Sequence, residues 1–354
     1  MSRKVRIAVI GAGWWSTYVH IPALQANPDA DLVAVSDPDT KKLEAAAHFY
    51  HLERTYADYR EMLATEQPEG VIIVTPHSTH YEITKYCLEQ NIHVMLEKPM
   101  TLYAVEAREL VELAQARGKE LIIGYSYNFL PLAKKAREVI SSGVLGRPQF
   151  VNCVMVSRVI EFLSGESAPS ANATSFPVHG PGAVYSQPHL SGGGQGHLQL
   201  THLAGLLFFV TGLRTRQVMA FMNNYGLPLD LVDAMTVEFE GGVLGTFGGS
   251  GNAFQHKLSL QIHCERGGID LDLVAGTLTG QGVDGPIEGL EIPAQQEPDD
   301  QKITTSKNLV DVILGRAANG SPGEIGWRAV ELLDAAYRSA AKGGDSIKIS
   351  SLYA

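Results

Sequence analysis

The sequence has few cysteines, no long apolar run and no excess of basic residues. Its three cysteines, Cys87, Cys153 and Cys264, lie far apart without a CxxC pair, so we expect reduced, buried thiols in a cytoplasmic protein. No stretch approaches the roughly 20 apolar residues of a membrane span, and residues 1–13 lead directly into a strand pattern, so we expect neither a membrane span nor a signal peptide. The formal net charge of −10 argues against nucleic acid as a partner and leaves small anionic substrates open.

Strand and helix patterns alternate regularly in the first third of the 354 residues. Five short runs are apolar almost throughout, as strands buried on both faces are: VRIAVI, LVAVSD, VIIVT, HVMLEK and ELIIGY. Helical patterns separate some of them, and one of these helices ends at the capping residue Gly118. The alternation predicts a doubly wound parallel sheet, a Rossmann-type α/β domain, over residues 1–125.

The pattern changes in residues 126–354. The expected elements follow in this order: a helix near 132–141, a strand near 149–157, an irregular stretch over 161–196, a helix near 197–210, strands such as MTVEFE and KLSLQIHC, and helices near 306–314 and 323–341. In these later strands apolar and polar residues alternate, which is typical of an antiparallel sheet with one face on a core. We therefore expect a second domain of α+β class.

The loop GAGWWS follows the first expected strand and has the form of a dinucleotide-binding turn. Gly11 permits the tight turn, Gly13 lets a pyrophosphate approach the backbone, and Ser16 is only slightly larger than the usual third glycine. The helix that follows offers free N–H groups to an anion. Trp14 and Trp15 either pack over the cofactor or cap the loop.

Asp37 ends the second expected strand, 26 residues after Gly11. An acidic side chain at this place binds the adenosine ribose hydroxyls and repels a 2′-phosphate, so it favours NAD over NADP. The alternative is that Asp37 is only a turn residue before Pro38.

Four further segments make the chain resemble the Gfo/Idh/MocA family of oxidoreductases over nearly its whole length: VIIVTPHSTHYE, HVMLEKPMTL, GVLGRP and LLDAAYRSAAKGGDSIKI. The EKP of the second segment is the most specific motif. The resemblance implies a Rossmann domain followed by a domain with an open, mainly antiparallel sheet, through which homodimers or homotetramers form. It also implies NAD(P)-dependent oxidation or reduction of a sugar, cyclitol or related polyol.

Carried over by the resemblance, the residues expected at the nicotinamide side of the cofactor are Thr75, Pro76, His77, His80, Glu97 and Lys98. Lys98 would also orient the substrate hydroxyl and assist proton transfer. A cation at the reacting oxygen stabilises alkoxide character, which supports this role.

The segment GGGQGHLQLTH, residues 192–202, corresponds to the family's second-domain motif. The resemblance gives His202 the role of proton acceptor, although a structural histidine remains the alternative. The family's aspartate position is occupied by Leu198, which cannot do polar work. Gln199 lies three residues before His202, so the two share a helix face, and we expect Gln199 to bind substrate.

Two further sets of residues complete the expected site. Asn128 stands where the family often has an arginine, and we expect it near the cofactor or substrate. His179, Tyr185 and His189 lie in the irregular stretch and offer groups that suit a polyol. No metal site is expected, because His197 and His202 are five residues apart and no cysteine or carboxylate joins the histidines.

Three functions remain open at this point. The first is an NAD-dependent oxidoreductase that acts on a sugar or cyclitol hydroxyl. The second is a redox-neutral NAD-dependent glycosidase, which oxidises a sugar hydroxyl transiently, eliminates the aglycone and returns the hydride. The third is a non-catalytic NAD-binding protein, against which the retention of Lys98 and His202 argues.

Overall fold

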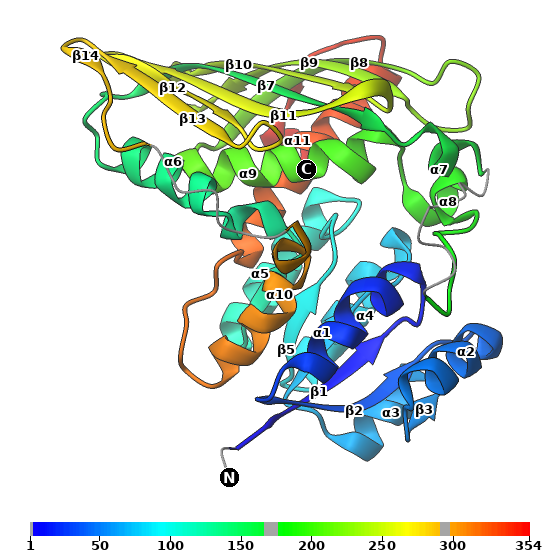
Figure 1. Cartoon of the computed structure of the whole chain (residues 1–354). Coiled ribbons are helices and arrows are strands. Elements are labelled where there is room, and N and C mark those ends of the chain that lie inside the picture. Colours follow the sequence, from blue (N-terminus) through cyan, green and yellow to red (C-terminus); the bar gives the residue numbers. More distant parts are fainter. Residues whose placement is uncertain (1–2, 166–175, 291–297) are drawn as a thin grey trace.

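The computed structural model describes residues 3–165, 176–290 and 298–354, which form two lobes, each built on one β-sheet. The first lobe holds a six-stranded sheet and the second a nine-stranded sheet, which forms the upper layer in Figure 1. Among the described residues, no helix is long and apolar enough to cross a membrane.

The six-stranded sheet confirms the predicted doubly wound architecture. Its strands pair in parallel in the order β3-β2-β1-β4-β5-β6. Their bounds are β1 Val5–Ile10, β2 Ala30–Ser36, β3 Thr55–Tyr56, β4 Gly70–Ile73, β5 His93–Leu96 and β6 Leu121–Ile123. The central strands are buried along almost their whole length, which explains why they read as apolar runs rather than as alternating patterns.

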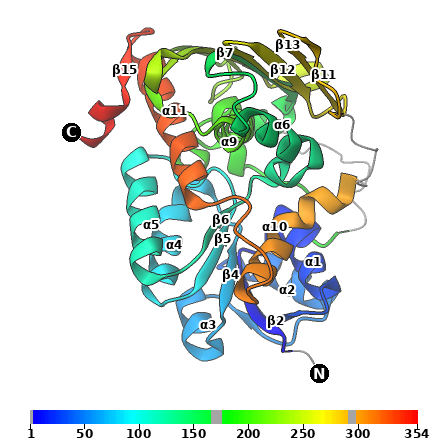
Figure 2. The same ribbon diagram turned by 90° about the vertical axis from the view of Figure 1, so that its left-hand side faces the viewer.

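Helices cover both faces of this sheet (Figure 2). On one face lie α3 Tyr59–Glu66, α4 His80–Glu89 and α5 Ala104–Arg117, and on the other lie α1 Ile21–Ala26, α2 Thr40–Tyr50 and α10 Pro298–Ile313. Gly118 caps α5 with a positive φ of 59°, as the sequence predicts. The helix α10 comes from the C-terminal part of the chain, yet its Leu309 and Val310 are buried with Val5 and Ile7 in the core of the first lobe.

The nine-stranded sheet is mainly antiparallel, with one parallel pair, β7 and β10. Its order is β14-β13-β12-β11-β7-β10-β9-β8-β15. The strand bounds are β7 Pro148–Arg158, β8 Thr215–Asn223, β9 Val232–Phe239, β10 Leu244–Ser250, β11 Asn252–Cys264, β12 Gly267–Asp272, β13 Thr277–Gly282, β14 Gly285–Pro286 and β15 Ile347–Lys348.

Three helices cover one face of this second sheet: α6 Pro131–Ser141, α9 Thr201–Thr211 and α11 Gly323–Ala341 (Figure 1). The side chains of α11 contact both α5 of the first lobe and β8 of the second, so one continuous apolar core joins the lobes. The stretch expected to be irregular contains two short helices, α7 Ile160–Ser164 and α8 Pro188–Ser191, and its residues 166–175 lie outside the described residues.

Candidate active site

The loop after β1 has the backbone geometry that a dinucleotide requires. Gly11 has a φ of 105°, and a Cβ there would lie 2.3 Å from the carbonyl oxygen of Val74, so only glycine fits. A Cβ on Gly13 would meet nothing within 4 Å, which leaves the backbone open to a pyrophosphate. Ser16 is fully buried, and its Oγ has no hydrogen-bond partner among the described residues. These features fit a bound dinucleotide.

Asp37 lies beside this loop at the carboxyl end of β2. Its Oδ2 accepts a hydrogen bond from the backbone N–H of Ala12 at 2.8 Å, and its Oδ1 accepts one from the N–H of Asp39, also at 2.8 Å. The carboxylate is therefore fixed at the loop by two backbone groups. This is the end of the sheet at which open α/β proteins bind their ligands.

Glu97, directly after β5, connects the loop to the EKP motif. Its Oε1 accepts hydrogen bonds from Trp15 Nε1 at 3.2 Å and from His20 Nε2 at 3.0 Å. A Cβ on Gly124 would lie 2.9 Å from the carboxylate, so glycine makes room for it. Burial raises the pKa of the Glu97 carboxyl, but the His20 hydrogen bond and the charge of Lys98 outweigh burial and lower it. Glu97 therefore stays ionised in a buried position.

His20 is a site residue that the sequence reasoning missed. It is fully buried in the π-helical turn Ser16–His20, and its Nδ1 lies 2.7 Å from the Oγ of Ser306 in α10. A neutral ring that donates from Nε2 to Glu97 accepts at Nδ1 from the serine hydroxyl. The available signal was its position ten residues after the first strand, but a lone histidine in a helix carries little information.

Lys98 reaches across to the second lobe. Its Nζ donates a hydrogen bond to the carbonyl oxygen of Leu198 at 3.0 Å. Burial lowers the pKa of the Lys98 ammonium to about 8, although the charge of Glu97 acts in the opposite direction. An ammonium with a lowered pKa of this kind can donate a hydrogen bond to a nearby hydroxyl, or exchange a proton with it, at neutral pH.

Gln199 and His202 face the same side of the helix that carries them. Both are half-buried, whereas Leu198, Leu200 and Thr201 between and beside them are buried. The Nδ1 of His202 is buried and has no partner among the described residues. Burial and the nearby Lys98 charge lower the pKa of His202 well below its ordinary value, so the ring is neutral at pH 7 and can accept a proton.

The π-helical turn Gly196–Leu200, which precedes α9, sets these positions. It turns the side chain of Leu198 into a small cluster with Leu163 and Leu231, while the Leu198 carbonyl oxygen receives Lys98. Leu198, which occupies the position of the family's aspartate, therefore contributes its backbone carbonyl oxygen as a hydrogen-bond acceptor rather than a side-chain group.

Asp230, a second residue that sequence reasoning missed, holds the glycine-rich segment before this turn. Its carboxylate accepts hydrogen bonds from the backbone N–H groups of Gly194 at 2.7 Å and Gly196 at 2.8 Å, and from the Tyr337 hydroxyl at 3.0 Å. A Cβ on Gly194 would lie 2.1 Å from the Asp230 carbonyl oxygen, which explains the run of glycines. Nothing in the sequence around Asp230 signals this contact.

Aromatic rings surround His202 and the loop. The Tyr127 ring lies 5.3 Å from that of His202, and the Tyr125 hydroxyl forms a 2.9 Å hydrogen bond with Thr201 next to it. The centroid of the Trp14 ring lies 5.8 Å from that of Phe162 of α7 in the second lobe.

The residues expected at the nicotinamide side lie after β4. Both ring nitrogens of His80 face backbone carbonyl oxygens, of Pro99 at 2.7 Å and Thr75 at 2.9 Å. The Nδ1 of His77 lies 2.9 Å from the Ser191 carbonyl oxygen. The two imidazoles therefore fix the turn around Pro76 and its contact with α8.

The remaining expected residues are more scattered. Tyr185 packs against His77, and both burial and the Glu97 charge raise its pKa, whereas His179 and His189 are exposed. Asn128 is buried beside Ser321, in a pocket that contains neither Lys98 nor His202. In the described part of the chain, no group of three or more His, Cys, Asp or Glu side chains could hold a metal ion.

Two family models match this chain. Residues 5–125 match the NAD-binding Rossmann fold of the Gfo/Idh/MocA oxidoreductase family, and residues 133–270 match a C-terminal domain of the same family. The chain belongs to the Gfo/Idh/MocA family. Both lobes of this Gfo/Idh/MocA protein are thus accounted for by the family, including most of the nine-stranded sheet.

Curated relatives of this Gfo/Idh/MocA chain include several sugar and cyclitol dehydrogenases. D-glucoside 3-dehydrogenase of Escherichia coli (strain K12) is 34% identical over 41% of this chain and 41% of that protein. The scyllo-inositol 2-dehydrogenase (NAD(+)) of Bacillus subtilis (strain 168) is 32% identical over 42% of this chain and 43% of its own length. D-xylose 1-dehydrogenase [NADP(+)] of Haloarcula marismortui is 30% identical over 45% of each. The chain therefore spans less than half the length of these relatives.

Solved structures match over nearly the whole chain. Levoglucosan dehydrogenase in complex with NADH and L-sorbose superposes with a TM-score of 0.81 at 17% identity, over 99% of this chain and 100% of that one. GenD2 from gentamicin A biosynthesis, in complex with NAD, gives a TM-score of 0.77 at 23% identity over 98% and 97%. At these identities the similarity shows the shared Gfo/Idh/MocA fold.

Proposed function

We propose that this protein is an NAD-dependent oxidoreductase that acts on a hydroxyl of a sugar, cyclitol or related polyol. The observation that carries the proposal is the approach of the Lys98 ammonium to the turn before His202, where its Nζ donates to the Leu198 carbonyl oxygen at 3.0 Å. An ammonium whose pKa is lowered to about 8 acts electrostatically on a half-buried, neutral imidazole with a free nitrogen, next to a loop that fits a dinucleotide.

In the proposed reaction, NAD bound at the loop would be the acceptor of the hydride. Lys98 donates a hydrogen bond to the reacting oxygen and stabilises its developing negative charge. His202 accepts the hydroxyl proton, because its ring is neutral near pH 7. Gln199, on the same face, binds a neighbouring hydroxyl and orients the ring of the substrate. Tyr185 is assigned to the substrate as well, together with His179 and His189 at the rim.

The cofactor is assigned to residues of the first lobe. Glu97, itself bound by His20, keeps Trp15 and Lys98 in place by accepting hydrogen bonds from Trp15 Nε1 and from the backbone N–H of Lys98 at 3.2 Å. The proposed contacts are Gly11, Gly13, Trp14, Trp15, Ser16, Asp37, Thr75, Pro76, His77, His80, Glu97 and Lys98, whereas Asn128, which lines the pocket beside α6, is not assigned to the cofactor. Asp37 supports NAD rather than NADP, because its anchored carboxylate would repel a 2′-phosphate.

The experiment that tests this proposal supplies free sugars, cyclitols and aryl glycosides with excess NAD. We expect NADH to form in proportion to the substrate consumed, and the Lys98→Met variant to turn over about a hundredfold more slowly with a similar NADH affinity. Aglycone release without net NADH would instead assign a redox-neutral glycosidase. NADH binding without turnover of any of these compounds would reject both enzymes.

We also propose that the protein forms a homodimer or homotetramer through the open face of the nine-stranded sheet. The large apolar side chains exposed on this sheet include Met219 by 48%, Phe221 by 65%, and Leu244 by 53% with its cross-strand neighbour Phe150 by 38%. Apolar side chains gathered on one face typically mark an association surface. Light scattering of the purified protein measures the mass directly, and a monomer would reject this assignment.

A further inference from the structure

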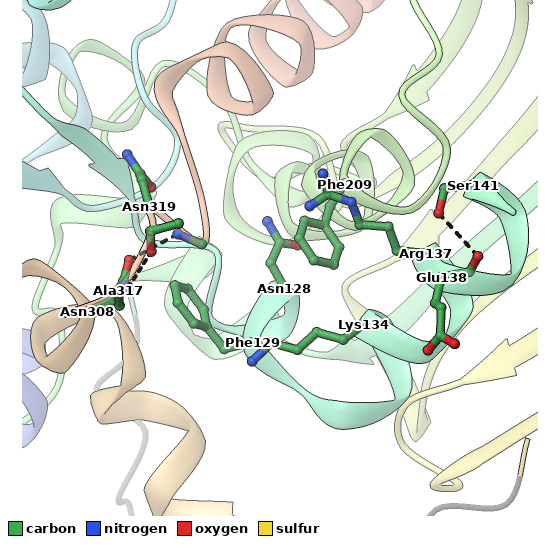
Figure 3. Close-up of a pocket in the computed structure, with 12 residues that line it drawn as sticks. Asn128, Phe129, Lys134, Arg137, Glu138, Ser141, Phe209, Asn308, Ala317 and Asn319 are labelled. Atoms are coloured by element: carbon green, nitrogen blue, oxygen red, sulfur yellow. Dashed lines mark hydrogen bonds between the residues drawn. The ribbon is translucent and has the colours of Figure 1, made fainter. Parts of the chain in front are cut away.

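A pocket of about 520 Å³, whose lining includes neither Lys98 nor His202, lies beside α6. Figure 3 shows the residues that line it. Its walls come from the 3-10 turn Ser126–Phe129, from α6, from Phe209 of α9 and from residues 317–320 between α10 and α11. The segment that carries residues 317–320 continues along the edge of the first sheet, where the N–H of Ile123 donates to the carbonyl oxygen of Ser321 at 2.8 Å. A volume of this size suits a small metabolite.

Two cations on α6 line this pocket. Lys134 and Arg137 are three residues apart and therefore lie on one face of the helix. Both are exposed, and neither has a carboxylate partner in the described ranges, whereas the neighbouring Lys135 pairs with Glu138 at 3.3 Å. Glu138 also lines the pocket, but its carboxylate is paired with Lys135, so the two unpaired cations still favour the binding of an anion there.

The same cations lie over aromatic rings that form the apolar part of the wall. The Arg137 guanidinium carbon is 4.7 Å from the ring centroid of Phe209, and the Lys134 Nζ is 5.9 Å from that of Phe129. These contacts hold the charged groups near the pocket without neutralising them. The phenyl rings also offer flat apolar surface of the kind that contacts the C–H faces of a sugar.

Asn128 adds an unsatisfied polar group to the wall. Its side chain is 1% exposed, Nδ2 donates to the Ser321 Oγ at 3.3 Å, and Oδ1 has no partner among the described residues. If the amide is turned around, its N–H groups become the unpartnered end instead. A ligand hydroxyl satisfies either orientation, because it both donates and accepts. Leaving a buried polar group unpaired is unfavourable, so a ligand hydroxyl that pairs with it gains binding free energy.

We propose that this pocket is a second binding site, distinct from the site at Lys98, for a small hydroxylated anion such as a sugar phosphate or a sugar carboxylate. The anionic group binds Lys134 and Arg137, the sugar face lies on Phe129 and Phe209, and a hydroxyl binds Asn128. Arginine recognises both phosphate and carboxylate oxygens through paired N–H groups, so the two anions share one chemistry.

Two of the pocket residues lie close in sequence to groups that form the active site. Asn128 follows Tyr127, whose ring contacts His202 at 5.3 Å. Asn308 lies two residues after Ser306, which binds His20 and through it Glu97. A ligand that draws the Ser126–Phe129 turn toward α6 therefore acts on the position of Tyr127 beside His202. The site is placed to act as an effector site.

The test titrates the full-length protein, saturated with NADH, with glucose 6-phosphate, gluconate, glucose and inorganic phosphate. We expect saturable binding of glucose 6-phosphate, gluconate or both, at least about tenfold tighter than that of glucose or phosphate alone, because charge and hydroxyl groups are both needed. Tighter binding of glucose 6-phosphate identifies a phosphate ester as the ligand, and tighter binding of gluconate identifies a carboxylate.

Binding measurements on variants, together with amide hydrogen exchange, show where the anion binds. Arg137→Gln should weaken binding at least about tenfold, while Lys342→Gln, which removes an exposed lysine elsewhere, should not. The ligand should slow amide exchange in residues 126–141 and 308–320 of the unaltered protein and not in Arg137→Gln. Equal binding by Arg137→Gln, protection confined to residues 11–20 and 97–102, or binding of none of the four probes would overturn the proposal.

Discussion

Asp233 provides the sharpest test of the electrostatics around the second-lobe motif. It lies in β9, is 2% exposed, and neither of its carboxyl oxygens accepts a hydrogen bond from the described residues. Burial, the charge of Asp230 and a hydrogen bond to Asp230 that only the protonated form can donate raise the pKa of Asp233 to about 9. Asp230 accepts three hydrogen bonds, so it remains the anion of the pair and Asp233 keeps the proton.

The pH dependence of stability follows from this assignment. The folded pKa lies above the unfolded value, so this group's contribution to stability is complete below pH ~4 and is lost as the pH rises through about 9. The free energy of unfolding should fall by about 1.4 kcal/mol per pH unit over that interval. At pH 7, roughly three units above the unfolded pKa, the loss amounts to about 4 kcal/mol.

Asp233→Asn removes the ionisation and keeps the size of the side chain. We expect the free energy of unfolding of this variant to exceed that of the unaltered protein by about 1.5 kcal/mol at pH 5 and by about 4 kcal/mol at pH 7. Urea unfolding at pH 5, 6, 7 and 8 measures both proteins. Asp230→Asn is the matched control and should destabilise by about 1–3 kcal/mol, because the amide has one acceptor oxygen in place of two and one of the N–H groups of Gly194 and Gly196 loses its partner. Unchanged or lower stability of Asp233→Asn at pH 7 would refute the reasoning.

Three further outcomes are expected. The value of kcat/KM for substrate oxidation should not change with pH around pH 7, because His202 is already neutral there. It should fall above pH 8, because Lys98, with a pKa of about 8, loses its proton. A kcat/KM that rises steadily to pH 10 would contradict the need for the cation. Asp37→Ala should narrow the preference for NADH over NADPH at least about tenfold in fluorescence titrations, and a protein that already prefers NADPH would contradict the role of Asp37. His20→Phe should lower the free energy of unfolding by about 1–3 kcal/mol, because Glu97 stays buried with one donor fewer, and unchanged stability would show that the His20 contact contributes little.

The elements that sequence predicts well are those whose local pattern and final environment agree. The strand VRIAVI is apolar throughout and is buried throughout as β1, and the pattern expected over 323–341 forms α11 with the same bounds. The two-residue strand β3 is too short to leave a pattern. The helix near 306–314 begins earlier, at Pro298, because the polar residues of its first turns do not show an apolar stripe.

The parts of the site that sequence could not predict depend on contacts between distant segments. The hydrogen bonds from His20 to Glu97 and Ser306 join residues 77 and 286 positions apart. The role of Leu198 changes for a local reason, because the π-helical turn directs its carbonyl oxygen toward Lys98 and its side chain away. The sequence identifies which residue occupies the motif position. The backbone conformation decides which atom of that residue faces Lys98.

The path of α10 limits how this chain can be divided. Leu309 and Val310 complete the core of the first sheet, and Ser306 completes the hydrogen bonding of His20 within it. A fragment that ends at residue 125 would leave part of that core open to water, so it should not fold as a separate nucleotide-binding unit. A chimera that exchanges cofactor preference with a relative must therefore carry α10 along with the N-terminal segment, although residues 126–297 separate them in the chain.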